Sequence, residues 1–502
     1  MVNVSAPVAE YFDVLIVGAG LSGVGAAAHL QNECPTKTFA IVEARAASGG
    51  TWDLFRYPGI RSDSDMYTMA YAFKPWTNEQ SFGDGDSIRN YIRDTARDRG
   101  IDDKIRYHSR VRRAAWSSAE ARWTVEIERA DTGITEYLAC RFLFGNTGYY
   151  RYDAGYTPEF AGRDSFGGRI VHPQHWPEDL DCTDKKVVVI GSGATAVTLV
   201  PALADQVGHV TMVQRSPSYI ASLPNTDPIG AVLRRRLSAK NAGRALRIKN
   251  MLFAWLIFQV SRHAPQFMKG LLLKGVAAQL PDDYDIGTHF TPRYLPWDQR
   301  LCFAPEGDLF TAIREGKASV VTGQIDSFVP SGLRLQSGEV LEADVIVTAT
   351  GLTMQMLGGM ALEVDGRPID VGRAVTYKSL MLCGVPNLAF IFGYTNSSWT
   401  LKSDLADRYV CRLLNYMDAH GYAACTPVEP DPALPTAPYL DLTAGYVQRA
   451  AGLFPLQGAE APWRVRHNYP VDYLMYRYGH VDDGVAFSRR VPDRAVSPSV
   501  AV

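Results

Sequence analysis

The chain has 502 residues, of which 46% are hydrophobic and 21% charged, with a formal net charge of −2. This length predicts two or three domains rather than one core, and the near-neutral charge argues against nucleic-acid binding. The seven cysteines are widely spaced and form no CxxC pair, which excludes a zinc or redox-dithiol motif. We therefore expect a protein of a reducing compartment, the cytoplasm, that holds no metal.

The first predicted unit near the N-terminus is a buried strand, a glycine-rich turn and a helix. Residues 13–18 form a continuous apolar run, typical of a strand buried on both faces, and an Ala-rich helix follows at 24–31. The turn between them, GAGLSG, has the spacing that lets a backbone approach a pyrophosphate at a helix N-terminus. Glu43 ends the next strand, 39–43, where an acid would bind a ribose hydroxyl. The glycines of the turn are Gly18, Gly20 and Gly23.

A second unit of the same kind follows about 170 residues later. A strand at 186–191 leads into GSGATA, a helix at 197–206 and a strand at 209–213. That last strand ends in Gln214 and Arg215 instead of an acid. Arginine pairs with a 2′-phosphate, so the second site is predicted to prefer NADP, although Arg215 could also form a surface salt bridge. The turn contains Gly191, Gly193 and Ala196.

The two units predict an α/β fold with two Rossmann-like dinucleotide-binding domains. We expect residues 1–150 and 351–502 to form the first domain and residues 151–350 the second. Residues 218–298 read as a helical insertion in the second domain, rich in basic residues around MLFAWLIF. This insertion could rest on an anionic membrane surface, but the interpretation we favour is a cover over a substrate pocket.

Two dinucleotide sites in one chain indicate that NADPH delivers hydride to a second bound dinucleotide. A cofactor that accepts hydride while it stays bound points to FAD at the N-terminal site. Residues 49–65, GGTWDLFRYPGIRSDSD, follow that site and are the candidates to shape the flavin end.

The segment 166–177, FGGRIVHPQHWP, fits neither a helix nor a strand period. Its Phe166, Gly168, His172 and Trp176-Pro177 match the fingerprint FxGxxxHxxxWP, so the chain resembles the flavin-dependent Baeyer–Villiger monooxygenases, the class B flavoprotein monooxygenases. Within that family, stretches such as IGSGATAVTLVPALAD and GYTNSSWTLK look most like the ethionamide-activating monooxygenases. In this family the fingerprint lies on an interdomain linker, so His172 is expected to be structural rather than a general base.

The resemblance implies an NADPH- and O2-dependent flavoprotein monooxygenase that inserts one oxygen into ketones through a C4a-peroxyflavin, giving esters or lactones. Thioether oxidation to sulfoxides is expected on the same flavin. Its partners would be a small ketone or sulfide and O2. The alternative is a flavin monooxygenase restricted to N- or S-oxygenation, against which the Trp176-Pro177 ending argues.

The resemblance also implies site residues, named here by their match to the family motifs. Arg300 would be the active-site cation and Asp63 the acid that orients it; a buried ion pair and a turn cap are the simpler readings. Gln299 departs from the lysine that many members carry before that arginine. Trp399 either lines the substrate pocket or is a core tryptophan. The expected FAD contacts are Ser22, Glu43, Thr51, Trp52, Asp53, Leu54, Asp63 and Val111; the expected NADP contacts are Arg61, Ser62, Asp63, Ile190, Gly191, Ser192, Gly193, Ala194, Thr195, Ala196, Gln214 and Arg215.

Overall fold

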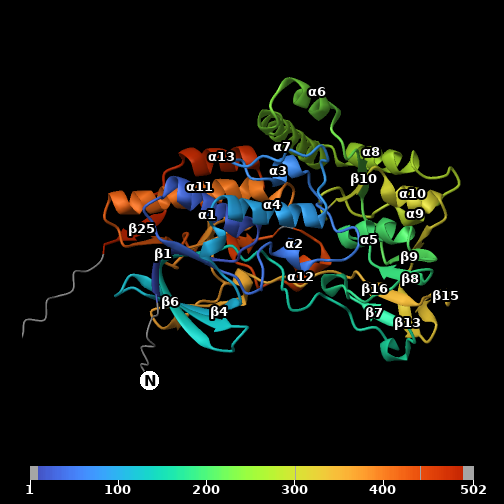
Figure 1. The fold of residues 1–502 in the computed structure, drawn as a ribbon, viewed down its shortest axis with the longest axis horizontal. Coiled ribbons are helices and arrows are strands. Elements are labelled where there is room, and N and C mark those ends of the chain that lie inside the picture. The colour runs from blue at the N-terminus through green and yellow to red at the C-terminus, as the bar shows by residue number, and fades with distance from the viewer. Residues whose placement is uncertain (1–9, 300, 441, 490–502) are drawn as a thin grey trace, which may run out of the picture.

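Two separate β-sheets organise the chain, as Figure 1 shows. The structure, a computed structural model, describes residues 10–299, 301–440 and 442–489. The first sheet draws its strands from the two ends of the chain and the second from its middle. The predicted α/β fold with two dinucleotide-binding sheets is confirmed, while the domain limits stay a prediction.

The first sheet is centred on β1, which pairs in parallel with both β2 and β6. The residues Val14–Val17 of β1 are buried because their alternate side chains enter two separate apolar clusters, one shared with α1 (Leu21–Glu33) and α11 (Trp399–Ala419) and the other with residues of β4 and β5. The sheet has the order β18-β17-β4-β5-β6-β1-β2-β3, with β21 also paired to β6. Its strands are β1 Glu10–Val17, β2 Phe39–Val42, β3 Ile105–Arg106, β4 Ser109–Ser117, β5 Arg122–Arg129, β6 Thr135–Gly145, β17 Ala361–Val364, β18 Arg367–Pro368 and β21 Leu388–Phe390.

Helices pack over one side of the first sheet, near the top of Figure 1. Small residues in α1 let it lie close to α11, and Val24, Ala27 and Leu30 belong to the core that these helices share. The helices are α1 Leu21–Glu33, α4 Gly85–Asp98, α11 Trp399–Ala419 and α13 Tyr469–Tyr478.

The second sheet is parallel throughout, with the order β12-β9-β8-β16-β7. Its central strands are apolar runs buried on both faces, and α5 packs against them. The strands are β7 Arg169–Val171, β8 Lys186–Ile190, β9 His209–Gln214, β12 Ala318–Thr322 and β16 Val345–Thr348; the helix α5 spans Ala194–Ala204.

The fingerprint segment differs from the linker that the resemblance implied. Residues Arg169–Val171 form β7, which pairs in parallel with β16 as the edge strand of the second sheet. Residues Pro173–His175 then form a single 3-10 turn. Three residues of the segment therefore belong to the second sheet. A strand of three residues is too short to show the alternating pattern by which strands are recognised in a sequence.

The predicted insertion contains helices that lie between β10, Ile220–Leu223, and β11, Cys302–Pro305. Figure 1 shows α6 and α7 standing at the outer edge of the molecule, away from both sheets. Across the described ranges, none of the helices combines the length and the apolar character that crossing a bilayer requires. The helices are α6 Pro228–Arg236, α7 Ala239–His263, α8 Pro265–Ala277 and α9 Ile286–His289.

Candidate functional site

One cavity of about 1210 Å³ lies between the two sheets and reaches both glycine turns. The turns follow β1 and β8, so both sit at the carboxyl ends of parallel strands, where α/β proteins bind ligands. The walls also take residues from the segments 49–64, 146–160 and 349–360. Because the lining includes residues of both turns, the cavity can accept one nucleotide at each turn.

The first glycine turn leaves its backbone open to a phosphate. Gly18 has φ +106°, and a Cβ there would lie 2.6 Å from the carbonyl oxygen of Asn146. Gly20 is the N-cap of α1 and provides no side chain to bind the first amides of the helix, which stay available to an anion. Gly23 packs against the strand instead, since a Cβ there would lie 1.8 Å from the carbonyl oxygen of Gly18.

Glu43 lies at the cavity wall beside this turn. One carboxylate oxygen accepts from the amide of Ala19 at 2.7 Å and the other from the amide of Arg45 at 2.9 Å. Burial raises the pKa of Glu43 above its ordinary value. The carboxylate thus fixes the turn, and its wall position is the one expected for a ribose contact.

Asp53 was expected to contact FAD, but its carboxylate lies within a cluster of three arginines. It accepts from Arg45 at 2.6 Å, from Arg56 at 2.8 Å and from Arg93 at 2.7 Å. Asp53 is buried and does not line the cavity. This arrangement braces α2, Thr51–Leu54, whose Thr51 and Trp52 do line it.

The second glycine turn is built like the first. Gly193 is the N-cap of α5 and has open space around it, so the helix N-terminus faces the cavity. Arg215 is exposed at the wall. Gln214 is turned inward, because its amide donates to the carbonyl of His289 at 2.8 Å and to Thr322 Oγ1 at 2.9 Å.

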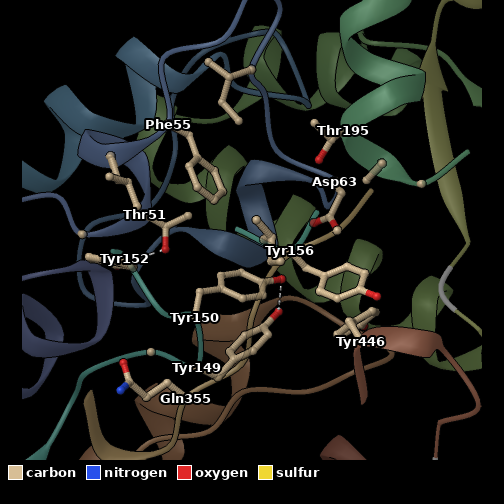
Figure 2. A pocket seen from close by; sticks show the side chains of 18 of the residues that line it. Thr51, Phe55, Asp63, Tyr149, Tyr150, Tyr152, Tyr156, Thr195, Gln355 and Tyr446 are labelled. Carbon is tan, nitrogen blue, oxygen red and sulfur yellow. Dashed lines mark hydrogen bonds between the residues drawn. The ribbon is translucent and has the colours of Figure 1, made fainter. Parts of the chain in front are cut away.

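The segment between the two turns places charged groups in the middle of the cavity. Arg61 bonds Asp308 at 2.5 Å through Nη1, while its buried Nη2 has no hydrogen-bond partner among the described residues. Asp63 lines the same space, and Figure 2 shows it entering from the same side as Thr195. Arg300 lies outside the described residues, but its neighbours Gln299 and Leu301 both line the cavity.

An aromatic wall faces this charged side. The hydroxyls of Tyr149 and Tyr150 lie 2.8 Å apart, as Figure 2 shows, and Tyr149 stacks on Trp399 with ring centroids 5.2 Å apart. Trp399 also donates from Nε1 to Ser22 Oγ at 2.6 Å. Trp399 therefore lines the cavity and also packs against the core, so it has features of both roles considered from the sequence, a pocket residue and a core tryptophan.

The tyrosines of this wall were missed in the sequence. Tyr149, Tyr150, Tyr152 and Tyr156 come from one short segment, YYRYDAGY, that passes from the first sheet toward the second. The signal in the sequence is this cluster of aromatic residues at the predicted boundary between the two domains, near residue 150. Gln355 and Tyr446, which Figure 2 also labels, come from distant loops without any such signal.

His172 of the fingerprint joins segments of backbone rather than facing the cavity. Its Nδ1 accepts from the amide of Gln174 at 3.2 Å, and its Nε2 lies 3.1 Å from the carbonyl oxygen of Gly351, so Nε2 carries the proton. Burial lowers the pKa of His172. The side chain of Gln174 donates to the carbonyls of Arg151 and Tyr152 at 2.9 and 3.0 Å. The fingerprint thus holds the crossing segment in place.

The residues present fit two dinucleotides. Two helix N-termini without a side-chain cap face the cavity, and Nη2 of Arg61 in its wall finds no hydrogen-bond partner in the described part of the chain. Among the described residues no cluster of His, Cys, Asp or Glu could hold a metal, and the seven cysteines are buried. Gly23, Asp53, Ala196 and Gln214 are set back from the wall. The predicted residues on the wall are Gly18, Gly20, Ser22, Glu43, Thr51, Trp52, Leu54, Arg61, Ser62, Asp63, Val111, Ile190, Gly191, Ser192, Gly193, Ala194, Thr195, Arg215 and Trp399.

Comparison with known proteins covers nearly the whole chain. Residues 16–79 match the family model of the NAD(P)-binding Rossmann-like domain. The chain is 52% identical over 483 residues to the FAD-containing monooxygenase EthA of Mycobacterium tuberculosis, covering 96% of this chain and 98% of the relative. It is 51% identical over 494 residues to the putative FAD-containing monooxygenase MymA of the same organism, covering 97% and 100%.

Solved structures share the fold at lower identity. An oxidised steroid monooxygenase bound to NADP superposes with a TM-score of 0.73 and 23% identity, covering 95% of this chain and all of that one. A cyclohexanone monooxygenase from Rhodococcus sp. Phi1 bound to NADP+ gives a TM-score of 0.69 and 19% identity, covering 84% and 87%.

Proposed function

Because the chain belongs to the FAD-containing monooxygenase family, we propose that it is an NADPH- and O2-dependent enzyme that inserts one oxygen atom into ketones, giving esters or lactones. We propose that it also oxidises thioethers to sulfoxides. The observation that carries the proposal is the single cavity onto which both glycine turns open. Ketone oxidation is carried over from the steroid and cyclohexanone monooxygenases that share this fold. The cytoplasmic location stays a prediction.

The cofactors are FAD and NADPH, and the chain's own groups have distinct tasks toward them. The amides at the N-terminus of α1 bind the FAD pyrophosphate, and Glu43 accepts hydrogen bonds from the ribose hydroxyls; the position of both at the cavity wall supports this. The amides at the N-terminus of α5 bind the NADPH pyrophosphate, and Arg215 pairs with the 2′-phosphate. When bound, the flavin supplies the reducing chemistry that activates O2.

The middle of the cavity holds the groups that act on the substrate. Tyr149, Tyr150 and Trp399 form an aromatic wall that binds an apolar substrate and keeps water out. Arg300, which keeps its charge at any working pH, is proposed to stabilise the negative charge that develops on a ketone oxygen, with Asp63 to orient it. Gln299 and Leu301, the sequence neighbours of this arginine, line the cavity, and this supports the proposal.

The proposal is tested with the purified flavoprotein, NADPH, a cyclic ketone and a thioether offered together. We expect NADPH consumption with formation of both the lactone and the sulfoxide. Arg300→Ala is expected to abolish the lactone, whereas Arg293→Ala, an exposed arginine seven residues earlier, should not. Sulfoxide without lactone from the unaltered enzyme would instead support a monooxygenase restricted to soft nitrogen and sulfur.

A further inference from the structure

The insertion carries an unusual charge for this protein. Residues 228–280 contain ten Lys or Arg and no Asp or Glu, whereas the whole chain has a net charge of −2. The rest of the chain therefore carries −12. The positive charge is concentrated on α6, α7 and α8; Figure 1 shows α6 and α7 at the outer edge of the molecule and α8 beside β10.

The inner side of α7 makes polar contacts with the first domain beside its buried Leu246. Arg247 of α7 donates to the carbonyl of Thr68 at 2.9 Å and bonds Asp404 at 2.9 Å. Asn250 donates to Asp65 at 2.8 Å, one helical turn farther along than Arg247. Hydrogen bonds and an ion pair, rather than apolar packing alone, thus attach α7 to the first domain.

The outer side of α7 is apolar, which reverses the usual arrangement of a helix on a globular protein. Ile248, Leu252 and Leu256 follow one another at four-residue steps, so they lie on one face, and more than half of each is exposed. Trp255 and Phe253 beside them are also exposed. The neighbouring helices add Ile229 and Val232 from α6 and Phe267 and Leu271 from α8.

Basic residues continue this face toward the N-terminal end of α7. Lys240 and Arg244 precede Ile248 at the same four-residue spacing, so they extend the apolar row. Arg235 and Arg236 lie at the end of α6. All four are exposed and have no ion-pair partner within the described part of the chain. Isolated surface leucines are ordinary, but nine exposed apolar side chains on three helices in contact, together with such charges, mark an interaction surface.

We propose that this face of α6, α7 and α8 binds the surface of an anionic lipid bilayer. An interfacial helix makes two kinds of contact with a bilayer: its apolar side chains reach the acyl chains, and its basic residues pair with the lipid phosphates. Tryptophan favours the boundary between the acyl chains and the headgroups. A second copy fits less well, because a two-fold contact would bring the same four unpaired cations of each protomer toward one another. Charge complementarity therefore selects the lipid.

Binding in this way would bring one wall of the cavity toward the bilayer. Phe258 of α7 packs edge-on against Trp297, with ring centroids 5.5 Å apart. Two residues after Trp297, Gln299 lines the cavity. The contact of Phe258 with Trp297 and the two-residue step to Gln299 thus connect α7 to the cavity wall.

The test is co-sedimentation of the FAD-loaded full chain with vesicles. Phosphatidylcholine vesicles are compared with equal mixtures of phosphatidylcholine and phosphatidylglycerol, at low and high salt. We expect the partition coefficient to be at least about tenfold larger for the anionic vesicles at low salt and to fall as salt rises. Absence of binding by the unaltered protein would overturn the proposal.

Two variants separate the charge from the apolar contact. The combined change R235E, R236E, K240E and R244E should remove the preference for anionic lipid. Leu252→Ser with Leu256→Ser should weaken binding to both vesicles, while the control Ile134→Ser with Val340→Ser, at exposed apolar residues outside the helices, should not. The proposal is contradicted if the charge-reversal variant or the α7 serine variant binds as the parent does. It is also contradicted if light scattering shows a dimer that the α7 serine substitutions dissociate.

Discussion

Trp399 Nε1 donates a hydrogen bond to Ser22 Oγ, and the two atoms are 2.6 Å apart. Trp399 begins α11 and Ser22 lies in the first turn of α1, so the bond joins residues 377 positions apart in the sequence. Ser22 is expected to contact FAD and Trp399 the substrate. A single hydrogen bond thus connects two residues of the cavity wall that come from distant parts of the chain.

Trp399→Phe removes this hydrogen bond but keeps a ring to stack on Tyr149. We expect the free energy of unfolding to fall by about 1 kcal/mol, the ordinary value of one hydrogen bond. Trp399→Ala removes the stacking as well and should cost about 3–5 kcal/mol. Urea unfolding followed by circular dichroism measures both. Equal stability of the Phe and Ala variants would mean that the stacked ring contributes nothing.

The parts of the site that were predictable follow from backbone chemistry. Gly18, Gly20 and Gly193 stand out in a sequence because a phosphate-binding turn admits few other residues at those positions. The Ser22–Trp399 bond and the place of Asp53 among three arginines depend on side chains that meet only after the chain folds. No spacing of residues in the sequence indicates these side-chain contacts.

The orientation of α7 shows the same limit. MLFAWLIF suggested a helix with apolar residues that would turn inward to cover a pocket. The carbonyls at residues 67–70 and Asp404 instead draw Arg247 inward and leave the apolar side outside. The side of α7 that faces the protein is thus set by contacts with residues that are distant in the sequence.

Gly59→Ala should disturb the contact between the two domains. Gly59 has φ +74°, and a Cβ there would lie 2.5 Å from the Cβ of Ala202 on α5. Gly100 has φ +60° but open space, so Gly100→Ala is a control with the same backbone strain of about 1 kcal/mol. We expect the clash to cost Gly59→Ala about 1–3 kcal/mol more and to slow flavin reduction by NADPH. Stopped-flow reduction and thermal unfolding test this; matching behaviour of the two variants would contradict it.

Arg215→Gln should change the choice between NADPH and NADH. Arg215 is exposed at the wall beside the second turn, where a 2′-phosphate would lie. A hydrogen bond to a charged group contributes about 1.5–3 kcal/mol, so the KM for NADPH should rise by about tenfold or more while that for NADH stays the same. Steady-state oxidation of each nucleotide measures this. An equal rise for both nucleotides would place Arg215 on the pyrophosphate instead.

His29 predicts a pH dependence of stability. Its two ring nitrogens each lie 3.2 Å from a carboxylate, Nδ1 from Glu33 and Nε2 from Asp404, so both donate and the ring is charged. Burial lowers the pKa of His29, but these hydrogen bonds and the charge of Asp407 outweigh it and raise the pKa to about 9.

The sign follows from this raised pKa. The folded state holds the proton of His29 more tightly than the unfolded state, so its contribution is complete below about pH 6.5 and is lost as the pH rises through about 9. The stability difference between the parent and His29→Gln should therefore shrink by on the order of 3 kcal/mol across this range. Urea unfolding of both proteins at several pH values from 6 to 9.5 measures it. A difference that stays constant with pH would show that folding does not raise the pKa of His29.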